Sequence, residues 1–167
     1  MGDISYTDER AQRMLFSDEA MGEEKYILYA DLADMDIGMS DFKSLDGKRI
    51  GVLMGTEPEI MLTQWENKNG IHTEHVNVNN NDDVEKKLAN QEIDCFVSLE
   101  ESIWSAQGIS SITTIGKSGI YFAINKARSD IKTELDYAMR QLDQESPFFK
   151  ADLYKKYFTL DYRQILT

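Results

Sequence analysis

The stretch that decides the fold is SLDGKRIGVLMGTEPE, which occupies residues 44–59. An Asp-Gly turn precedes the apolar run Arg49–Met54, and this run predicts a buried β-strand that ends at Gly55. A helix should follow at once, because Thr56 and Glu59 have the spacing of a capping box and a proline falls in the first turn. A strand that passes directly into a helix is the repeating unit of α/β proteins.

The same alternation of strands and helices continues on both sides of this stretch. Upstream, Lys25–Ala30 is a β-like run, and the acidic segment 31–42 after it predicts a loop with a short helix. Downstream, the predicted order is a helix over 56–70, a strand over 71–78, a helix capped by Asp82, a buried strand over 92–99, a short helix over 101–107 and two β-rich runs between 110 and 125 that are broken by Gly116 and Gly119. This order predicts an α/β sheet with helices on its faces.

Two further helices are predicted near the C-terminus. Ser129 is the expected cap of the first, which should end before Pro147 and bury one apolar stripe. That stripe consists of Ile131, Leu135, Ala138, Met139 and Leu142. The last helix, about Phe149–Phe158, should bury Leu153, Tyr154, Tyr157 and Phe158, and residues 161–167 read as a linker.

Composition excludes several classes of protein. The chain has 167 residues, a net charge of -12 and 41% hydrophobic residues. This apolar content argues against disorder, and the negative charge argues against nucleic-acid binding and docking on anionic lipid. A single cysteine, Cys95, cannot form an internal disulfide and is predicted to be a buried strand thiol. No segment approaches the ~20 apolar residues of a membrane span.

The junction between the decisive strand and its helix is a candidate anion site. Free backbone N–H groups and the positive end of the helix could hold a carboxylate at Gly55 and Thr56, with the Thr56 hydroxyl as a further donor. Plain N-capping is the alternative, because Glu57 and Glu59 would repel an anion.

Three other groups of residues bear on function. Arg10 could clamp a carboxylate with its guanidinium fork, although a surface arginine is the commoner outcome. Glu100 and Glu101 follow the buried strand and could recognise an amine, or could simply start a helix. His72 and His75 lie three apart on a predicted strand and should face opposite sides, so we predict no metal site and no cofactor.

The order of the motifs resembles the extracellular solute-binding proteins of family 3, the type II periplasmic binding proteins for polar amino acids. The resemblance covers roughly residues 4–158. Its most specific parts are the T-x-x-R…FS stretch that includes Arg10, the L-x-G-K-x-I-G-V-x-x-G-T stretch that ends at Thr56, and the late K-K-Y-F.

This resemblance implies a fold in which two α/β lobes close over a small solute. Ser5 and Arg10 then correspond to first-lobe residues that hold a carboxylate, and Thr56 corresponds to the second-lobe residue at the helix start. The implied ligand-binding set is Ser5, Arg10, Gly55, Thr56, Glu57 and Glu100. Residues 27–117 would form lobe two, and residues 1–24 with 120–160 would form part of lobe one.

The chain departs from the family in two respects. The family has a strand and a helix upstream of the arginine motif, so here lobe one should be truncated and the ligand cleft should lack one wall. The family's amine-binding Asp falls near Leu99, with Glu100 next to it. The chain is therefore expected to be part of a larger polypeptide, and it resembles the extracytoplasmic sensor regions of membrane-anchored bacterial diguanylate cyclases and sensor kinases.

Four functions remain open from the sequence. The first is an extracytoplasmic sensor module for a small polar solute such as an amino acid, with a homodimer formed through the incomplete lobe. The second is the substrate-binding component of an ABC transporter. The third is a dehydratase-like enzyme on the same fold, with Glu57 or Glu100 as the cleft carboxylate, although the sequence favours a protein that is not an enzyme. The fourth is an α/β interaction module without a small ligand.

Overall fold

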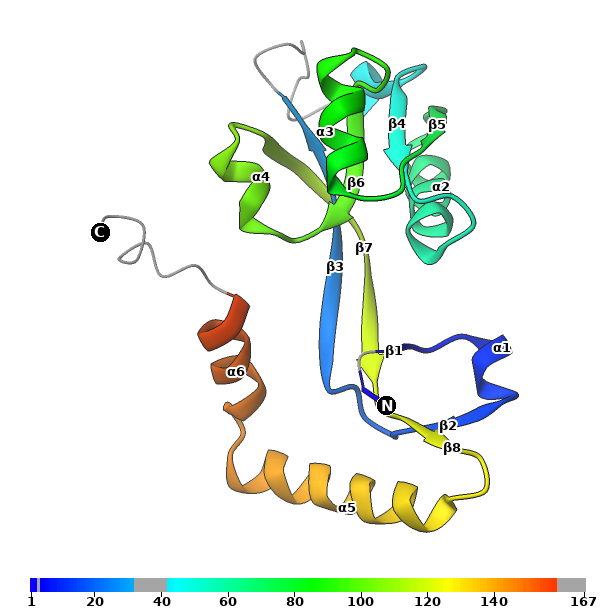
Figure 1. Ribbon diagram of the computed structural model, residues 1–167, viewed down its shortest axis with the longest axis vertical. Helices are drawn as coiled ribbons and strands as arrows, with labels where there is room; N and C mark the ends of the chain where they lie inside the picture. Colours follow the sequence, from blue (N-terminus) through cyan, green and yellow to red (C-terminus); the bar gives the residue numbers. More distant parts are fainter. Residues whose placement is uncertain (3, 32–41, 159–167) are drawn as a thin grey trace. The chain divides into compact units, whose positions relative to one another are not determined.

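The computed structural model describes residues 1–2, 4–31 and 42–158 (Figure 1). Its elements, in chain order, are β1 (Ile4–Ser5), α1 (Asp8–Ala11), β2 (Met14–Phe16), β3 (Gly22–Ala30), η1 (Phe42–Leu45), β4 (Arg49–Val52), α2 (Glu57–Asn69), β5 (Glu74–Asn77), α3 (Asn81–Ala89), β6 (Cys95–Leu99), α4 (Ser102–Ala106), β7 (Ser110–Tyr121), β8 (Ala123–Asn125), α5 (Ser129–Glu145) and α6 (Phe149–Phe158). Most of the predicted loop over 31–42 and the predicted linker over 161–167 lie outside the described residues.

The chain divides into two compact units. Unit 1 comprises residues 1–24 and 118–167, and unit 2 comprises residues 25–117. The strands β3 and β7 have residues in both units. The assignment of these parts as one complete lobe and one truncated lobe stays a prediction.

The strands of unit 2 form a mixed sheet. The order of strands in the whole sheet is β1-β7-β3-β6-β4-β5. The strands β4, β5 and β6 are parallel, with Ile50 opposite both His75 and Cys95, whereas β3 runs antiparallel to β6. Parallel neighbours joined by helices confirm the predicted α/β rhythm.

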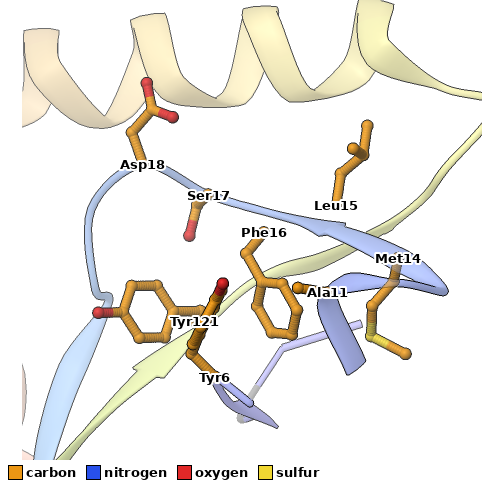
Figure 2. A pocket seen from close by; sticks show the side chains of 8 residues that line it. All are labelled: Tyr6, Ala11, Met14, Leu15, Phe16, Ser17, Asp18 and Tyr121. Atoms are coloured by element: carbon orange, nitrogen blue, oxygen red, sulfur yellow. The ribbon is translucent and has the colours of Figure 1, made fainter. Parts of the chain in front are cut away.

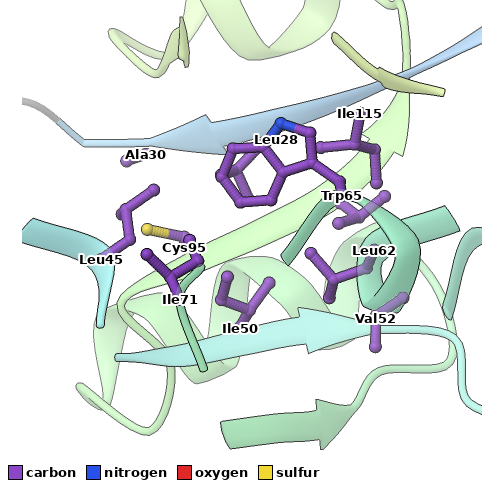
Figure 3. Close-up of a cluster of buried hydrophobic side chains, with 11 residues drawn as sticks. Leu28, Ala30, Leu45, Ile50, Val52, Leu62, Trp65, Ile71, Cys95 and Ile115 are labelled. Carbon is purple, nitrogen blue, oxygen red and sulfur yellow. The ribbon is translucent and has the colours of Figure 1, made fainter. Parts of the chain in front are cut away.

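One face of this sheet is covered by α2. Its helix residues Leu62 and Trp65 pack against Ile50 and Val52 of β4 and against Cys95 of β6 (Figure 3). Burial on both faces explains why the β4 and β6 runs are continuously apolar. The predicted burial of Cys95 is confirmed, since its side chain is fully buried.

The other face of the sheet is covered by α3 and α4. Val84 of α3 and Trp104 of α4 belong to a second buried cluster with Ile27, Tyr29 and Phe96. Alternation along β3 separates the two cores, because Ile27 and Tyr29 face this side whereas Leu28 and Ala30 face α2. Unit 2 is therefore a three-layer α/β body.

Unit 1 is built from short strands and the helices α1, α5 and α6. The strands β2 and β8 form a separate antiparallel pair, and β1 pairs antiparallel with the end of β7. The buried apolar residues described for this unit are Phe16, Ala123, Ile124 and Met139. Both clusters of buried apolar residues described for the chain belong to unit 2. The two units thus differ sharply in how much core they contain.

The prediction that Gly116 and Gly119 interrupt the β-rich segment over 110–125 is wrong, because the first twelve residues of this segment form one strand. The strand β7 runs without a break through Gly116 and Gly119. A Cβ on Gly116 would meet the sulfur of Met61, and a Cβ on Gly119 would lie 2.9 Å from the ring of Tyr121. These glycines allow close approach of neighbouring side chains rather than ending the strand.

Two predicted helix caps are also wrong. Asn80, not Asp82, caps α3, where its side chain accepts the backbone N–H of Asp83. Arg128, not Ser129, holds the cap position of α5 and makes no side-chain cap bond. In α3 the earlier residue Asn80 takes the cap position, so the helix begins before Asp82.

The predicted inward faces of the C-terminal helices need correction. In α5, Met139 is buried as predicted, whereas Ile131 is exposed and Asp136 is buried. In α6, Leu153 is 39% exposed instead of buried, and the side chains of Tyr154, Tyr157 and Phe158 lie outside those that the structure describes. Asp136 is buried because it binds Lys132 and the backbone N–H of Asp18, and the periodicity of apolar residues cannot reveal such contacts.

Candidate functional site

A pocket of about 480 Å³ lies in unit 1 (Figure 2). Three aromatic rings line it, from Tyr6, Phe16 and Tyr121. The rings of Tyr6 and Phe16 meet edge-to-face with centroids 5.1 Å apart, and Phe16 and Tyr121 are perpendicular at 6.2 Å. Such contacts fix the rings relative to one another. Aliphatic lining comes from Ala11 of α1 and from Met14 and Leu15 of β2.

Ser17 and Asp18 form the polar end of this pocket. The Ser17 hydroxyl donates to the Glu19 carbonyl at 2.8 Å and accepts the Phe122 N–H at 3.2 Å. Asp18 binds Lys132 and lies 3.3 Å from Arg140. The bond from Lys132 is the main cause that holds the pKa of Asp18 below its ordinary value. The carboxylate at the pocket's edge is therefore ionised and neutralised.

The same lysine ties the segment that follows β2 to α5. Lys132 Nζ lies 2.5 Å from Asp136 Oδ2, and the other Asp136 oxygen accepts the Asp18 N–H at 2.9 Å. The bonds to Asp136 and Asp18 raise the pKa of Lys132. Asp136 is buried, and these two bonds give each of its carboxylate oxygens a partner inside the unit.

Ser5 and Arg10 come together beside this pocket. The Arg10 Nη1 group donates to the Ser5 carbonyl oxygen at 2.9 Å, and Thr7 Oγ1 accepts the Arg10 backbone N–H at 3.2 Å. Among the residues that the structure describes, the Ser5 hydroxyl and the rest of the Arg10 fork have no protein partner. By contrast, Arg13 pairs with Glu9 at 3.3 Å. The fork of Arg10 is thus anchored and still able to bind an anion.

Gly55, Thr56 and Glu57 come together at the start of α2. The Gly55 N–H donates to Glu59 Oε2 at 2.7 Å, and the Thr56 hydroxyl donates to the Leu53 carbonyl at 2.5 Å. Thr56 holds the N-cap position but makes no side-chain cap bond, and the Glu59 carboxylate accepts the N–H of Gly55 rather than that of Thr56, so the predicted capping box does not form. The chain's own Glu59 carboxylate thus occupies the predicted anion position.

Glu59 also belongs to an ionic cluster between α2 and β5. Its Oε1 atom lies 3.6 Å from His75 Nδ1, and His75 Nε2 lies 3.1 Å from Oε1 of the buried Glu66. Thr73 Oγ1 donates to the same Glu66 oxygen. This cluster orients Glu59 towards Gly55. His72 precedes β5 and is exposed, so the two histidines do not meet at a common site.

Glu100 lies at the end of β6, in unit 2. Lys25 Nζ contacts its Oε2 atom at 2.9 Å, so an amine ligand would compete with this lysine. Within the described residues, no group of three acidic, histidine or cysteine side chains could hold a metal ion. Burial raises the pKa of the Cys95 thiol to about 12, which leaves it unreactive.

The structure therefore divides the predicted ligand-binding residues into three local groups. Ser5 and Arg10 form one, Gly55 with Thr56 and Glu57 another, and Glu100 stands with Lys25. Sequence reasoning missed the aromatic pocket, although Tyr6 and Phe16 lie inside the motif around Arg10. It also missed the role of His75. A histidine nine residues after a glutamate carries no periodic signal.

Among the described residues, no helix combines the length and apolarity needed to cross a bilayer.

A family model described as NMT1/THI5 like matches residues 28–131, which is more than half of the chain. The chain belongs to the NMT1/THI5-like family. No curated protein sequence is significantly similar to this NMT1/THI5-like chain.

Solved structures extend the likeness to nearly the whole chain. The probable amino-acid ABC transporter extracellular-binding protein ytmK from Bacillus subtilis has a TM-score of 0.76 and 17% identity over 96% of this chain and 70% of its own. An ancestral arginine-binding protein bound to arginine has a TM-score of 0.65 and 18% identity over 93% of this chain and 69% of its own.

A third solved structure is the ancestral amino acid-binding protein AncCDT-1, a precursor of cyclohexadienyl dehydratase. Its TM-score is 0.69, with 17% identity over 94% of this chain and 67% of its own. These matches confirm the predicted fold, which is the α/β fold of type II periplasmic binding proteins. The NMT1/THI5-like chain spans about 70% of the length of the first of these proteins.

Proposed function

We propose that the chain is an extracytoplasmic module that binds a small solute of the amino-acid type. The observation that carries this proposal is the anchored Arg10 fork, whose remaining donors have no protein partner among the described residues. A planar fork held in place at one nitrogen can bind a carboxylate without further ordering. The fold supports the proposal, because the arginine-bound ancestral protein shares it.

The carboxylate of the solute would contact Arg10 and the Ser5 hydroxyl. The Ser5 carbonyl holds Nη1, so the fork's remaining N–H groups can pair with two carboxylate oxygens. Ser5 adds a neutral donor that is free among the described residues. Arg13 is a poor substitute because Glu9 already neutralises it.

The residues proposed in unit 2 would act only after displacing partners within the chain. A ligand anion at Gly55 and Thr56 must replace the Glu59 carboxylate, and an amine at Glu100 must replace Lys25. These exchanges make the unit 2 contacts weaker than those of Arg10. Glu57 would tune the local charge at the helix start.

Titration of the ¹⁵N-labelled chain with the common amino acids tests the proposal. We expect shifts of the backbone amides around Ser5 and Arg10 at millimolar ligand, because the contacts proposed in unit 2 must first displace Glu59 and Lys25. Absence of shifts for every amino acid would contradict the proposed function.

We further propose that the module senses its solute for a downstream signalling domain of a membrane-anchored protein. The resemblance to sensor regions of diguanylate cyclases and sensor kinases supports this. A substrate-binding component of an ABC transporter is the alternative. The genomic sequence tests the choice: a downstream membrane span and catalytic domain favours sensing, whereas a lone lipoprotein signal favours transport.

Enzymatic activity is the less favoured reading. The dehydratase alternative has support from AncCDT-1, a precursor of cyclohexadienyl dehydratase with this fold. Its candidate carboxylates are Glu57 and Glu100, and Glu100 is held in an ion pair. Turnover of a cyclic hydroxy acid that is lost in Glu57→Gln or Glu100→Gln would establish an enzyme, and no turnover would remove that alternative.

Homodimerisation through unit 1 is a further part of the proposal. The exposed apolar side chains Tyr137, Phe148 and Phe149 lie on α5 and α6 or between them, with Phe148 75% exposed. Exposed apolar surface of this kind favours association. Light scattering should find a dimer that Phe148→Ser weakens and that Met54→Ser, an exposed change in unit 2, leaves intact. A monomer at all concentrations would contradict the dimer.

A further inference from the structure

The walls of the unit 1 pocket suit an apolar guest. Its aromatic rings come from Tyr6, Phe16 and Tyr121, and Met14 and Leu15 add aliphatic surface (Figure 2). Phe16 is buried, whereas Tyr6 is 48% exposed and can still bury ring surface. Rings that already pack edge-to-face offer the geometry in which a further ring or alkyl group binds well.

The charge in the pocket does not favour a cationic guest. Among the described lining residues, Asp18 is the only charged one. Its carboxylate is shared by Lys132 and Arg140. A cation that entered would have to compete with two resident cations for this carboxylate, whereas a neutral side chain would leave the ion pairs intact.

The pocket begins next to the proposed carboxylate site. Tyr6 follows Ser5 in the chain and Ala11 follows Arg10, and both Tyr6 and Ala11 line the pocket. Adjacent Cα atoms are about 3.8 Å apart, which is comparable to the span from an amino acid's carboxylate to its side chain. The pocket and the proposed carboxylate site therefore share one short segment of unit 1.

We propose that the pocket formed by Tyr6, Phe16 and Tyr121 binds the apolar side chain of an amino acid whose carboxylate is held by Arg10, with aromatic amino acids preferred. The volume of about 480 Å³ falls inside the range of small-molecule sites, about 300–1,000 Å³. This inference rests on the proposed function and names its ligand class.

The test follows methionine methyl groups by NMR in the full chain. Met14 lines the pocket, and Met54 is an exposed methionine of unit 2 that serves as the internal control. Titration with L-phenylalanine should shift the Met14 methyl by ring currents and leave the Met54 methyl unchanged. L-leucine should bind more weakly, and L-arginine, L-glutamate and tetramethylammonium should bind at least about tenfold more weakly than L-phenylalanine.

A pair of exposed tyrosines supplies matched variants. Tyr6→Ser removes a pocket ring, and Tyr137→Ser removes a ring of similar exposure from α5. Tyr6→Ser should weaken L-phenylalanine binding about tenfold, and Tyr137→Ser should leave it unchanged. Both positions are at the surface, so both variants should fold.

The possible results separate a failure of the pocket assignment from a failure of the proposed amino-acid binding. Preferential binding of L-arginine, L-glutamate or tetramethylammonium would overturn the assignment of an apolar ligand. If the preferred ligand were L-arginine or L-glutamate, the proposed function of binding an amino acid would still hold. L-phenylalanine binding that shifts Met54 but not Met14, or that ignores Tyr6→Ser, would overturn the location. Failure of every amino acid to bind at millimolar concentration would overturn both proposals.

Discussion

Replacing Gly51 with alanine tests the packing of β4 against the second core cluster. A Cβ at this position would lie 2.9 Å from Cδ1 of Ile93 and 3.0 Å from Cγ1 of Val78. It would also lie 3.3 Å from Cβ of Phe96. The Ile93 methyl can rotate away, but valine has few alternative rotamers, and the Phe96 Cβ is fixed by the backbone of β6.

The expected loss of stability follows from two opposing effects. Overpacking a filled core costs about 1–3 kcal/mol. Restricting the unfolded chain by adding a methyl group to glycine offsets about 0.4–1 kcal/mol of this. The free energy of unfolding should therefore fall by about 1–2 kcal/mol in Gly51→Ala.

Urea unfolding followed by tryptophan fluorescence measures this change, because Trp65 and Trp104 each belong to one of the two clusters of unit 2. Ile93→Val removes the closest atom and supplies a double-mutant cycle with Gly51→Ala. The double variant should be more stable than the sum of the single effects predicts, by about 0.5 kcal/mol or more. Unchanged stability in Gly51→Ala, or strict additivity, would refute the reasoning.

Three further predictions follow. Asp94 accepts two charged hydrogen bonds from Arg49, which hold the pKa of Asp94 below 3.8. A carboxylate whose pKa is lowered by folding stabilises the protein at pH values above its unfolded pKa, and this stabilisation is lost as the pH falls through the folded pKa. Asp94→Asn should therefore lower the free energy of unfolding by about 1 kcal/mol in urea melts at neutral pH and match the parent in strong acid. Arg10→Ala should weaken amino-acid binding in NMR titrations at least about tenfold while Arg13→Ala does not, and equal effects would remove the assigned role of Arg10. Cys95, with its pKa raised to about 12, should react with a disulfide reagent only after urea unfolding, and rapid labelling of the folded chain would contradict its burial.

The sequence predicted unit 2 well because its elements carry local signals. The runs at β4 and β6 are apolar on both faces, and Gly70 ends α2 in the left-handed conformation that favours glycine. The wrong prediction that Gly116 and Gly119 break the strand also has a physical cause. Glycine marks either a break or a close approach, and only the neighbours Met61 and Tyr121 distinguish the two.

Unit 1 was predicted less completely. Its strands β1, β2 and β8 have two or three residues, which is too short for an alternating pattern to appear. The pocket joins Tyr6 to Tyr121 across most of the chain, and Asp136 is buried by its bonds to Asp18 and Lys132. Contacts between residues so distant in sequence have no signature in a single chain, whereas the motif around Arg10 was visible because its members are consecutive.

The contact between Glu66 and His75 has an evolutionary consequence. Glu66 is buried with His75 and Thr73 as its partners, so each residue makes the other two tolerable at their positions. A change at one of them should be accepted in relatives only together with changes at the others. Glu59 should also change together with them, because it contacts His75. These four positions are expected to covary as a block, even between proteins that bind different solutes.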